Sequence, residues 1–267
     1  MINHSTRIGR LRVANRVKLG VLCAVTVFVA ACSTKEAPGP LEPTTTVGRV
    51  RLVNVITDAL RGRVNASLEG LVFTVDLQYA QSAPANLPTP ATAPYAPVYT
   101  GSRSFVLKRT ADTTVTVATI PFSISDGQDR SVYAIGGASG SAITGFSTTD
   151  DNTLGSATQT RVRIVQMSPT ATGPLDFFIT AAGADLTTAT PVATGLAYQA
   201  ASSYFVVAPG SYIVRAVLSS TAAADRNSSV LITSATATFA GSTVRTVVAA
   251  DAAAGGGPLR AFVLADR

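Results

Sequence analysis

The chain has 267 residues, and its 21 Lys and Arg against 15 Asp and Glu give a formal net charge of +6. Five of the basic residues lie within the first 18 positions, a segment that holds no acidic residue. The rest of the chain has 16 basic against 15 acidic residues, so it lacks the basic surface that nucleic-acid binding requires.

The residues that most enzymes use for nucleophilic or metal chemistry are confined to the start of the chain. The one His is His4, and the two Cys are Cys23 and Cys32. Catalytic triads need an imidazole as general base, and zinc, haem and most copper sites need His or Cys ligands. The sequence also contains no Walker loop and no dinucleotide-binding glycine fingerprint. We therefore predict that the region after Cys32 is not an enzyme and needs no cofactor.

The N-terminus has the order of a secretory signal. The basic segment is followed by an uncharged run over 19–31, which is shorter than the roughly 20 apolar residues that a membrane-spanning helix needs. Residues 1–31 are therefore predicted to be a signal peptide.

The end of that run, Val29-Ala30-Ala31-Cys32, resembles the bacterial lipobox, in which the Cys is acylated and becomes the mature N-terminus. The alternative is an ordinary secretory signal in which Cys32 has no role. If the resemblance holds, each buried methylene contributes about 0.8 kcal/mol, so two or three acyl chains anchor the protein durably. Ser33 stands where Asp would favour the inner membrane, so the resemblance implies an outer-membrane lipoprotein that faces the periplasm or the cell surface.

The region after Cys32 begins with a Pro- and Thr-rich segment over 32–46, which is typical of a flexible tether. From Val47 onward, runs of β-branched and aromatic residues alternate with Gly, Pro, Asp and Asn, a pattern that predicts short strands. The sequence therefore predicts an all-β protein.

The clearest local pattern lies in 203–217. Pro209 and Gly210 separate two apolar runs, 203–207 and 212–217, and the Pro-Gly pair predicts a turn that joins them as an antiparallel hairpin. Further strands are expected over 242–248 and 259–264. This succession is typical of a β-sandwich.

The two halves of this region resemble each other. The matching segments are 48–53 with 160–165, 104–107 with 204–207, 130–134 with 245–249, and Phe146 and Asp150 with Phe262 and Asp266. The matching segments are separated by 112, 100, 115 and 116 positions, respectively. We assign the fall to 100 to a Pro-rich insert at 82–97 in the first half, and the rise to 115 to a polar stretch at 219–229 in the second half. We predict two tandem immunoglobulin-like antiparallel β-sandwich domains, 47–152 and 159–267, joined by a linker at 153–158.

A family resemblance accompanies the repeat. The segments Arg161–Pro169, Leu175–Phe178, Gly195–Tyr198 and Ala208–Tyr212 resemble the domain of unknown function 4397. That family occurs in secreted and lipid-anchored bacterial proteins, often in tandem, and the resemblance implies an immunoglobulin-like sandwich. It is clearer over 159–267 than over 47–152, where Asn54-Val55-Ile56 replaces the Ser-Pro element. The family has no established activity, so the resemblance implies no site.

Two constellations of charged residues are candidates for binding. Arg49 with Arg51, and Arg161 with Arg163, lie two apart on strands and so share a face. They form either a basic strip for an acidic glycan or lipid headgroup, or a solvated face that protects a sheet edge, which we favour. Oxygen-rich clusters that Ca²⁺ would suit contain Asp126, Asp129, Asp150 and Asp151, but neither cluster has the spacing of a calcium loop, so we assign no metal.

Aromatic and proline residues offer weaker candidates. Tyr95, Tyr99, Tyr198 and Tyr204 could stack on sugar rings, although core packing is favoured for most of them. The insert at 82–97 is either a polyproline ligand or a surface loop.

The leading hypothesis is a lipid-anchored, non-enzymatic envelope protein that acts as a spacer or binding module. One alternative is a carboxylate-dependent carbohydrate-active enzyme, which needs two carboxylates about 5 to 9.5 Å apart across a pocket. Its candidates are Asp76, Asp112, Asp126, Asp129 and Asp176. The other alternative is a subunit of an envelope complex with a protein or glycan partner.

Overall fold

The structure is a computed structural model that describes residues 46–84 and 95–267. The predicted signal peptide, Cys32, all of the predicted tether except residue 46, and residues 85–94 of the Pro-rich insert lie outside the described residues. The described residues fall in one compact unit. Their helical elements are two 3-10 turns, η1 (Ala138–Gly140) and η2 (Ala223–Asp225), and none of these residues forms a helix that could cross a membrane.

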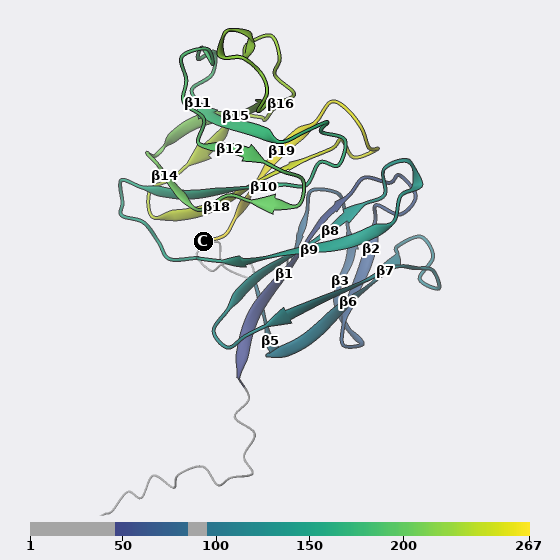
Figure 1. The fold of residues 1–267 in the computed structure, drawn as a ribbon. Helices are drawn as coiled ribbons and strands as arrows, with labels where there is room; N and C mark the ends of the chain where they lie inside the picture. The colour runs from purple at the N-terminus through teal and green to yellow at the C-terminus, as the bar shows by residue number, and fades with distance from the viewer. Residues whose placement is uncertain (1–45, 85–94) are drawn as a thin grey trace, which may run out of the picture. The chain divides into compact units, whose positions relative to one another are not determined.

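The first sandwich consists of two sheets that enclose one apolar core (Figure 1). Its first sheet has the order β4 (Ser82–Ala83), β1 (Val47–Ile56), β8 (Asp129–Gly136) and β9 (Ile143–Asp150), with β5 (Ala96–Tyr99) also beside β1. Its second sheet has the order β3 (Leu71–Leu77), β2 (Val64–Leu68), β6 (Gly101–Arg109) and β7 (Thr116–Ile124). Alternate residues of these strands, such as Leu52, Phe105 and Ile120, point between the sheets and are buried there.

The second sandwich repeats this arrangement. Its first sheet has the order β13 (Ala200–Ala201), β10 (Thr160–Gln166), β18 (Thr243–Ala250) and β19 (Arg260–Ala265), with β14 (Phe205–Val207) also beside β10. Its second sheet has the order β12 (Ala193–Leu196), β11 (Leu175–Thr180), β15 (Gly210–Leu218) and β16 (Ile232–Thr233), with β17 (Ala237–Phe239) also beside β15. Ile164, Phe177 and Val247 belong to its core. The all-β sandwich class is thus confirmed.

The first sheet of each sandwich is mixed rather than wholly antiparallel, which corrects one part of the prediction, whereas the strand pairs of both second sheets are antiparallel. β1 pairs with β8 in parallel, and β10 pairs with β18 in parallel. Parallel strands need to be covered on both faces, and β1 is buried along nearly all of its length. One face of β1 meets the core of its own sandwich, and the other face meets the second sandwich.

The predicted hairpin at 203–217 is wrong. β14 pairs with β10 in one sheet, whereas β15 pairs with β11 in the other, so Ala208 and Pro209 carry the chain across the sandwich. Gly210 does not take the positive φ that the expected turn required. Both strands are amphipathic because each faces the same core from opposite sides, and local sequence does not distinguish this crossing from a hairpin.

This crossing also corrects one match in the repeat. β5 and β14 occupy equivalent places beside β1 and β10, and β6 is therefore equivalent to β15. The segment 104–107 in β6 consequently has no counterpart in 204–207. The first residues of β6 and β15, Gly101 and Gly210, are 109 positions apart, so the true offset drifts much less than the matched segments indicated.

A third apolar cluster lies between the sandwiches. Val53 and Tyr133 of the first sandwich pack in one buried cluster with Val165, Val248 and Leu264 of the second. Burial of each large aliphatic side chain contributes about 1.5 to 3 kcal/mol relative to exposure. The two sandwiches therefore share part of their core, although no strand of one pairs with a strand of the other among the described residues.

Candidate functional site

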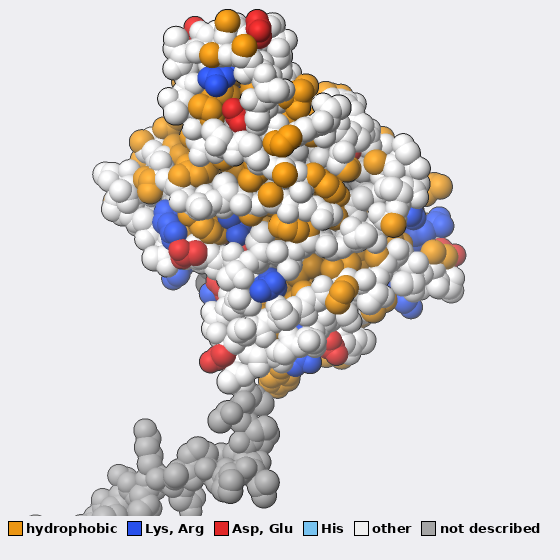
Figure 2. Space-filling view, viewed as in Figure 1, with side chains coloured by type: hydrophobic (Ala, Val, Ile, Leu, Met, Phe, Trp, Pro, Cys, Tyr) orange, Lys and Arg blue, Asp and Glu red, His pale blue; other side chains and the backbone are white. Residues whose placement is uncertain are grey.

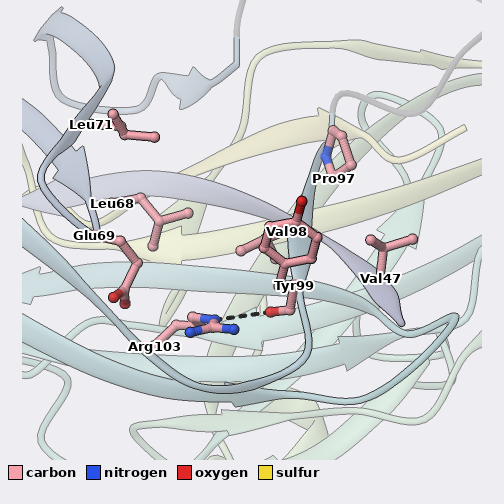
Figure 3. Close-up of a pocket in the computed structure, with 8 residues that line it drawn as sticks. All are labelled: Val47, Leu68, Glu69, Leu71, Pro97, Val98, Tyr99 and Arg103. Carbon is pink, nitrogen blue, oxygen red and sulfur yellow. Dashed lines mark hydrogen bonds between the residues drawn. The ribbon is translucent and has the colours of Figure 1, made fainter. Parts of the chain in front are cut away.

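A groove of about 590 Å³ opens at the end of the first sandwich where β1 begins (Figure 3). One wall comes from the turn between β2 and β3, and the other from β5 and the start of β1, with Arg103 of β6 lying between them. The lining residues are Val47, Leu68, Glu69, Leu71, Pro97, Val98, Tyr99 and Arg103. Most of this surface is apolar.

The turn between β2 and β3 shapes the first wall. Glu69 and Gly70 both have positive φ, at 51° and 81°, which is the requirement of a two-residue type I′ turn. That turn places Leu68 directly opposite Leu71 on the two strands. The tip of the hairpin therefore presents leucine side chains to the groove.

The charged residues of the groove hold its walls in place. Arg103 donates from Nε to the carbonyl of Tyr99 at 2.9 Å and from Nη2 to the carbonyl of Thr100 at 2.7 Å. Glu69 accepts a long hydrogen bond of 3.4 Å from the backbone N–H of Ser104. The arrangement suits an apolar or aromatic partner, because the polar side chains are engaged with the backbone.

A second constellation lies inside the molecule, and we call it the crossed arginine cluster: Arg51, Ser131, Asp150, Arg163, Thr246 and Asp266. Both guanidinium groups are buried. Arg51 donates from Nη2 to Asp266 Oδ1 at 2.5 Å and from Nε to Ser131 Oγ at 2.7 Å. Arg163 donates from Nη2 to Asp150 Oδ1 and from Nε to Thr246 Oγ1 at 2.9 Å.

The pairs cross from one sandwich to the other. Arg51 of the first sandwich bonds to Asp266 of the second, and Arg163 of the second bonds to Asp150 of the first. The Nη1 atoms also bond across the two sandwiches. Arg51 Nη1 donates to the carbonyl of Ala265, and Arg163 Nη1 donates to the carbonyl of Thr149. The two halves of the cluster thus have matching contacts, and Arg51 has in addition a longer ion pair of 3.8 Å with Asp150 of its own sandwich.

Aromatic rings complete the cluster. The Tyr95 ring lies 4.8 Å from the Arg51 guanidinium, and the Tyr204 ring lies 5.1 Å from that of Arg163. Tyr95 also donates from its hydroxyl to Asp150 Oδ2 at 2.6 Å. These two tyrosines are thus tied to the arginines and are not free to stack on sugar rings, whereas Tyr99 and Tyr198 are exposed.

The electrostatics keep the buried pairs charged. Burial alone would raise the pKa of Asp150, but Arg163 and Arg51 outweigh burial and hold that pKa below its ordinary value. Burial would lower the pKa of Arg51, but Asp266, Tyr95, Asp150 and Tyr133 together outweigh burial, so the pKa of Arg51 rises. Burial also raises the pKa of Tyr95 and Tyr133, which keeps both hydroxyls protonated.

The expectation of a solvated arginine face is wrong for Arg51 and Arg163, because the second sandwich covers Arg51 and the first sandwich covers Arg163. Arg49 and Arg161 do reach solvent, but Arg49 pairs with Asp129 at 2.6 Å and Arg161 pairs with Asp151 at 2.6 Å. Each of the four arginines thus has a carboxylate partner, and no unpaired basic strip results.

The calcium candidates have other partners. Asp126 accepts from the N–H of Val47, Asp129 bonds to Arg49 and Asn152, Asp150 belongs to the crossed arginine cluster, and Asp151 pairs with Arg161. The pairing with Arg161 lowers the pKa of Asp151. In the part of the chain that the structure describes, no three His, Cys, Asp or Glu residues are grouped so that they could hold a metal ion.

The carboxylates proposed for glycoside chemistry are dispersed in structural contacts. Asp76 pairs with Arg63, Asp112 bonds to Thr114, and Asp176 accepts from Gly195 and Ser219. Asp126 and Asp129 have the partners given above. None of the five lines the groove or the smaller hollow beside Leu60 and Arg109.

The groove and the crossing of the ion pairs were both missed from the sequence. The groove has no motif, because its lining comes from four separate segments. The crossing did have a signal: Arg51 and Arg163 recur at equivalent positions, and so do Asp150 and Asp266. A buried charge is expected to have a buried partner, so the recurrence of both signs indicated pairing.

Comparison with curated proteins finds no match. Among solved structures the chain is similar to the Bacillus anthracis TIE protein, with 12% identity and a TM-score of 0.21 over 65% of this chain and 29% of that one. A leucine-rich repeat protein from Bacteroides thetaiotaomicron has 11% identity and a TM-score of 0.20, over 75% of this chain and 25% of that one. A family 26 carbohydrate-binding module of Eubacterium rectale Amy13K, in complex with maltoheptaose, has 7% identity and a TM-score of 0.22, over 82% of this chain and 96% of that one. The chain thus spans less than a third of the first two, and these likenesses are too low to bear on function.

A family model does match. Residues 48–178 match DUF4397, a domain of unknown function. The match covers the first sandwich and continues through β10 and most of β11, so it falls largely on the half whose motifs resembled the family less clearly. The segments Gly195–Tyr198 and Ala208–Tyr212 lie outside it. The similarity to the DUF4397 family is thus shown for residues 48–178 and not for the chain as a whole.

Proposed function

We propose that this chain is a lipid-anchored, non-enzymatic protein of the cell envelope whose two sandwiches act as one stiff spacer or binding module. The observation that carries this proposal is the crossed arginine cluster. With the shared apolar cluster beside it, the cluster ties each sandwich to the other through two buried ion pairs. A spacer requires such a connection, because a hinge between its domains would leave the distance that it spans undefined.

The anchor in this proposal is a lipid on Cys32 at the outer membrane, with the sandwiches in the periplasm or at the cell surface. Replacement of Cys32 by Ser removes the acylated thiol, so we expect the Cys32→Ser protein to leave the membrane fraction and appear in the soluble fraction. Cell fractionation with immunoblotting measures this. Cys23→Ser is the matched control, because Cys23 lies inside the predicted signal peptide and its loss leaves the anchor intact. A Cys32→Ser protein that stays with the membrane contradicts the lipid anchor.

The second sandwich is proposed to be a second copy of the same domain. Its strands have the same order as those of the first, and each member of the crossed arginine cluster has an equivalent in the other half. Gene duplication followed by divergence accounts for both features.

A role as a subunit of an envelope complex is the second candidate, and the apolar groove favours it. Capture of the intact protein from its own envelope measures this role, and a stoichiometric protein partner would support it. The glycoside-hydrolase hypothesis has no comparable support, because its candidate carboxylates are engaged in structural contacts.

A further inference from the structure

The end of the first sandwich that holds the groove also exposes large apolar side chains, and we call it the tether-side surface: Val47, Leu71, Val72 and Tyr99. Their exposed fractions are 44%, 75%, 77% and 60%. We propose that this surface lies on the lipid bilayer and is a membrane-contacting site, in addition to the anchor. The proposal rests on the lipid anchor of the proposed function.

These residues lie at the ends of three strands, β1, β3 and β5, near the point where the described chain begins. Val47 is the first residue of β1, and its N–H and carbonyl bond to Asp126 and Gly127 in the turn between β7 and β8. Thr46 bonds to Thr100 in the turn between β5 and β6 at 2.7 Å. Figure 2 shows hydrophobic side chains at this end of the described chain. The surface is therefore the part of the sandwich that directly follows the predicted tether.

The length of the predicted tether brings this surface to the membrane. Fifteen residue steps separate Cys32 from Val47, so the chain reaches at most about 50 Å when fully extended, and about 20 Å as a random coil. Anchoring at Cys32 thus keeps Val47 within about 50 Å of the lipid. The tether-side surface is therefore the part of the sandwich that lies nearest to the anchor along the chain.

The chemistry of the surface matches the zone between lipid headgroups and acyl chains. Leucine and valine side chains bury apolar area there, and tyrosine places its ring in that zone with its hydroxyl toward water. The nearby charges are Glu69, Asp126 and Arg103, and Arg49 is already paired with Asp129. Because both acidic and basic side chains lie near the surface, we expect it to contact zwitterionic lipid as readily as anionic lipid.

The chain offers a clean probe, because it contains no Trp. Leu71→Trp introduces one fluorophore on the tether-side surface. Leu60→Trp is its matched control, because Leu60 is 74% exposed and follows the far end of β1. Each acylated protein is reconstituted into phosphatidylcholine vesicles with brominated acyl chains, which quench Trp fluorescence within the membrane, and again into vesicles that also contain phosphatidylglycerol. Thermal unfolding checks that both variants are folded.

We expect quenching of the Leu71→Trp protein to exceed that of the Leu60→Trp protein about two-fold or more, and equally in both lipid mixtures. Equal quenching of the two variants would overturn the proposal. A blue shift of the Leu71→Trp emission in native envelopes but not in vesicles would also overturn it, because the surface would then bind a protein. Failure of the anchor gives a different result, since neither variant would float with the vesicles.

Discussion

Arg51 shows how this protein uses a buried charge. Removal of a guanidinium from water is costly, and its attraction to Asp266 offsets that cost only with good geometry and further hydrogen bonds. Arg51 has both, through Ser131 and the carbonyl of Ala265. The net contribution of such a pair to stability is small, whereas loss of one partner leaves the other charge buried and unpaired. Its main effect is therefore to specify how the sandwiches meet.

Arg51→Met tests this at the residue scale. We expect the free energy of unfolding to fall by about 3 to 5 kcal/mol, because Asp266 is left buried without its partner, and the double variant Arg51→Met/Asp266→Leu to recover most of the loss. Urea titration followed by circular dichroism measures both. Arg63→Met, in the exposed pair with Asp76, is the control and should cost at most about 1 kcal/mol. A double variant as unstable as the single one would contradict this account.

Acid should weaken the same cluster. The pKa of Asp150 in the folded protein lies below its ordinary value of 3.8, because Arg163 and Arg51 outweigh burial. Its ionised form therefore contributes stability that is complete above pH 3.8 and is lost as the pH falls through the folded value. We expect the free energy of unfolding to decrease below pH 3.8, and this decrease to be smaller in Asp150→Asn. Asp225→Asn, at an exposed position, should keep the wild-type acid dependence.

Residue-level prediction from the sequence succeeded in part. Equivalent arginines in the two halves were identified, and alternation along the strand correctly placed Arg49 and Arg51 on one face. The burial of Arg51 was missed because a strand pattern shows which residues share a face but not what covers that face. The covering surface comes from residues more than 100 positions away.

Among the elements, the connection between the sandwiches is held firmly to the second one. The N–H of Ser242 donates to the carbonyls of Ser156 and Gln159, both at 3.0 Å. Gly241 permits this contact, because a Cβ at that position would lie 1.7 Å from the carbonyl oxygen of Ala157. The segment predicted as a linker is therefore fixed against the turn between β17 and β18.

Gly241→Ala should separate that turn from the connection. Because the clash is with backbone and not with a flexible side chain, we expect a loss of about 1 to 3 kcal/mol of stability, seen as a lower midpoint of thermal unfolding. Gly173→Ala is the matched control, because its Cβ would meet only Leu218 at 3.5 Å, and it should change stability by less than about 0.5 kcal/mol. Equal unfolding midpoints for the two variants would show that the contact between the connection and the turn between β17 and β18 does not contribute to stability.

Strand positions were predicted more accurately than strand partners. The expected strands over 242–248 and 259–264 correspond closely to β18 and β19. The partners of β14 and β15 were wrong, because pairing depends on contacts distant in sequence, and a Pro-Gly pair suits a crossing between sheets as well as a hairpin. Local propensity determines where a strand forms, and the apolar core determines which sheet it joins.

For the whole molecule, the shared cluster of Val53, Tyr133, Val165 and Val248 predicts a single unfolding transition. Scanning calorimetry should give equal calorimetric and van't Hoff enthalpies, because neither sandwich buries this face alone. In the double variant Arg51→Met/Arg163→Met the connection is weakened from both sides, and two transitions are expected. Two transitions in the wild-type protein would show that the sandwiches fold independently.

At this scale the sequence predicted the all-β class but not the contact between the halves. Composition and alternation suffice for an all-β prediction, and the recurrence of short segments indicated duplication. The contact was missed because Val53 and Val165 are as apolar as Leu52 and Ile164, which face the sandwich cores. A strand that is apolar on both faces requires a second covering layer.

The crossed pairing has a consequence for how this gene can change over time. Arg51 makes its short ion pair with Asp266 of the other half and a longer one of 3.8 Å with Asp150 of its own half, and Arg163 pairs with Asp150. Loss of an arginine or aspartate of the cluster from one half would leave a buried charge unpaired in the other, so we expect substitutions there to be inherited in pairs that span the gene. A protein that kept only one of the two halves would need another carboxylate for its buried arginine. A second copy of the same half, in a separate chain, could supply that carboxylate.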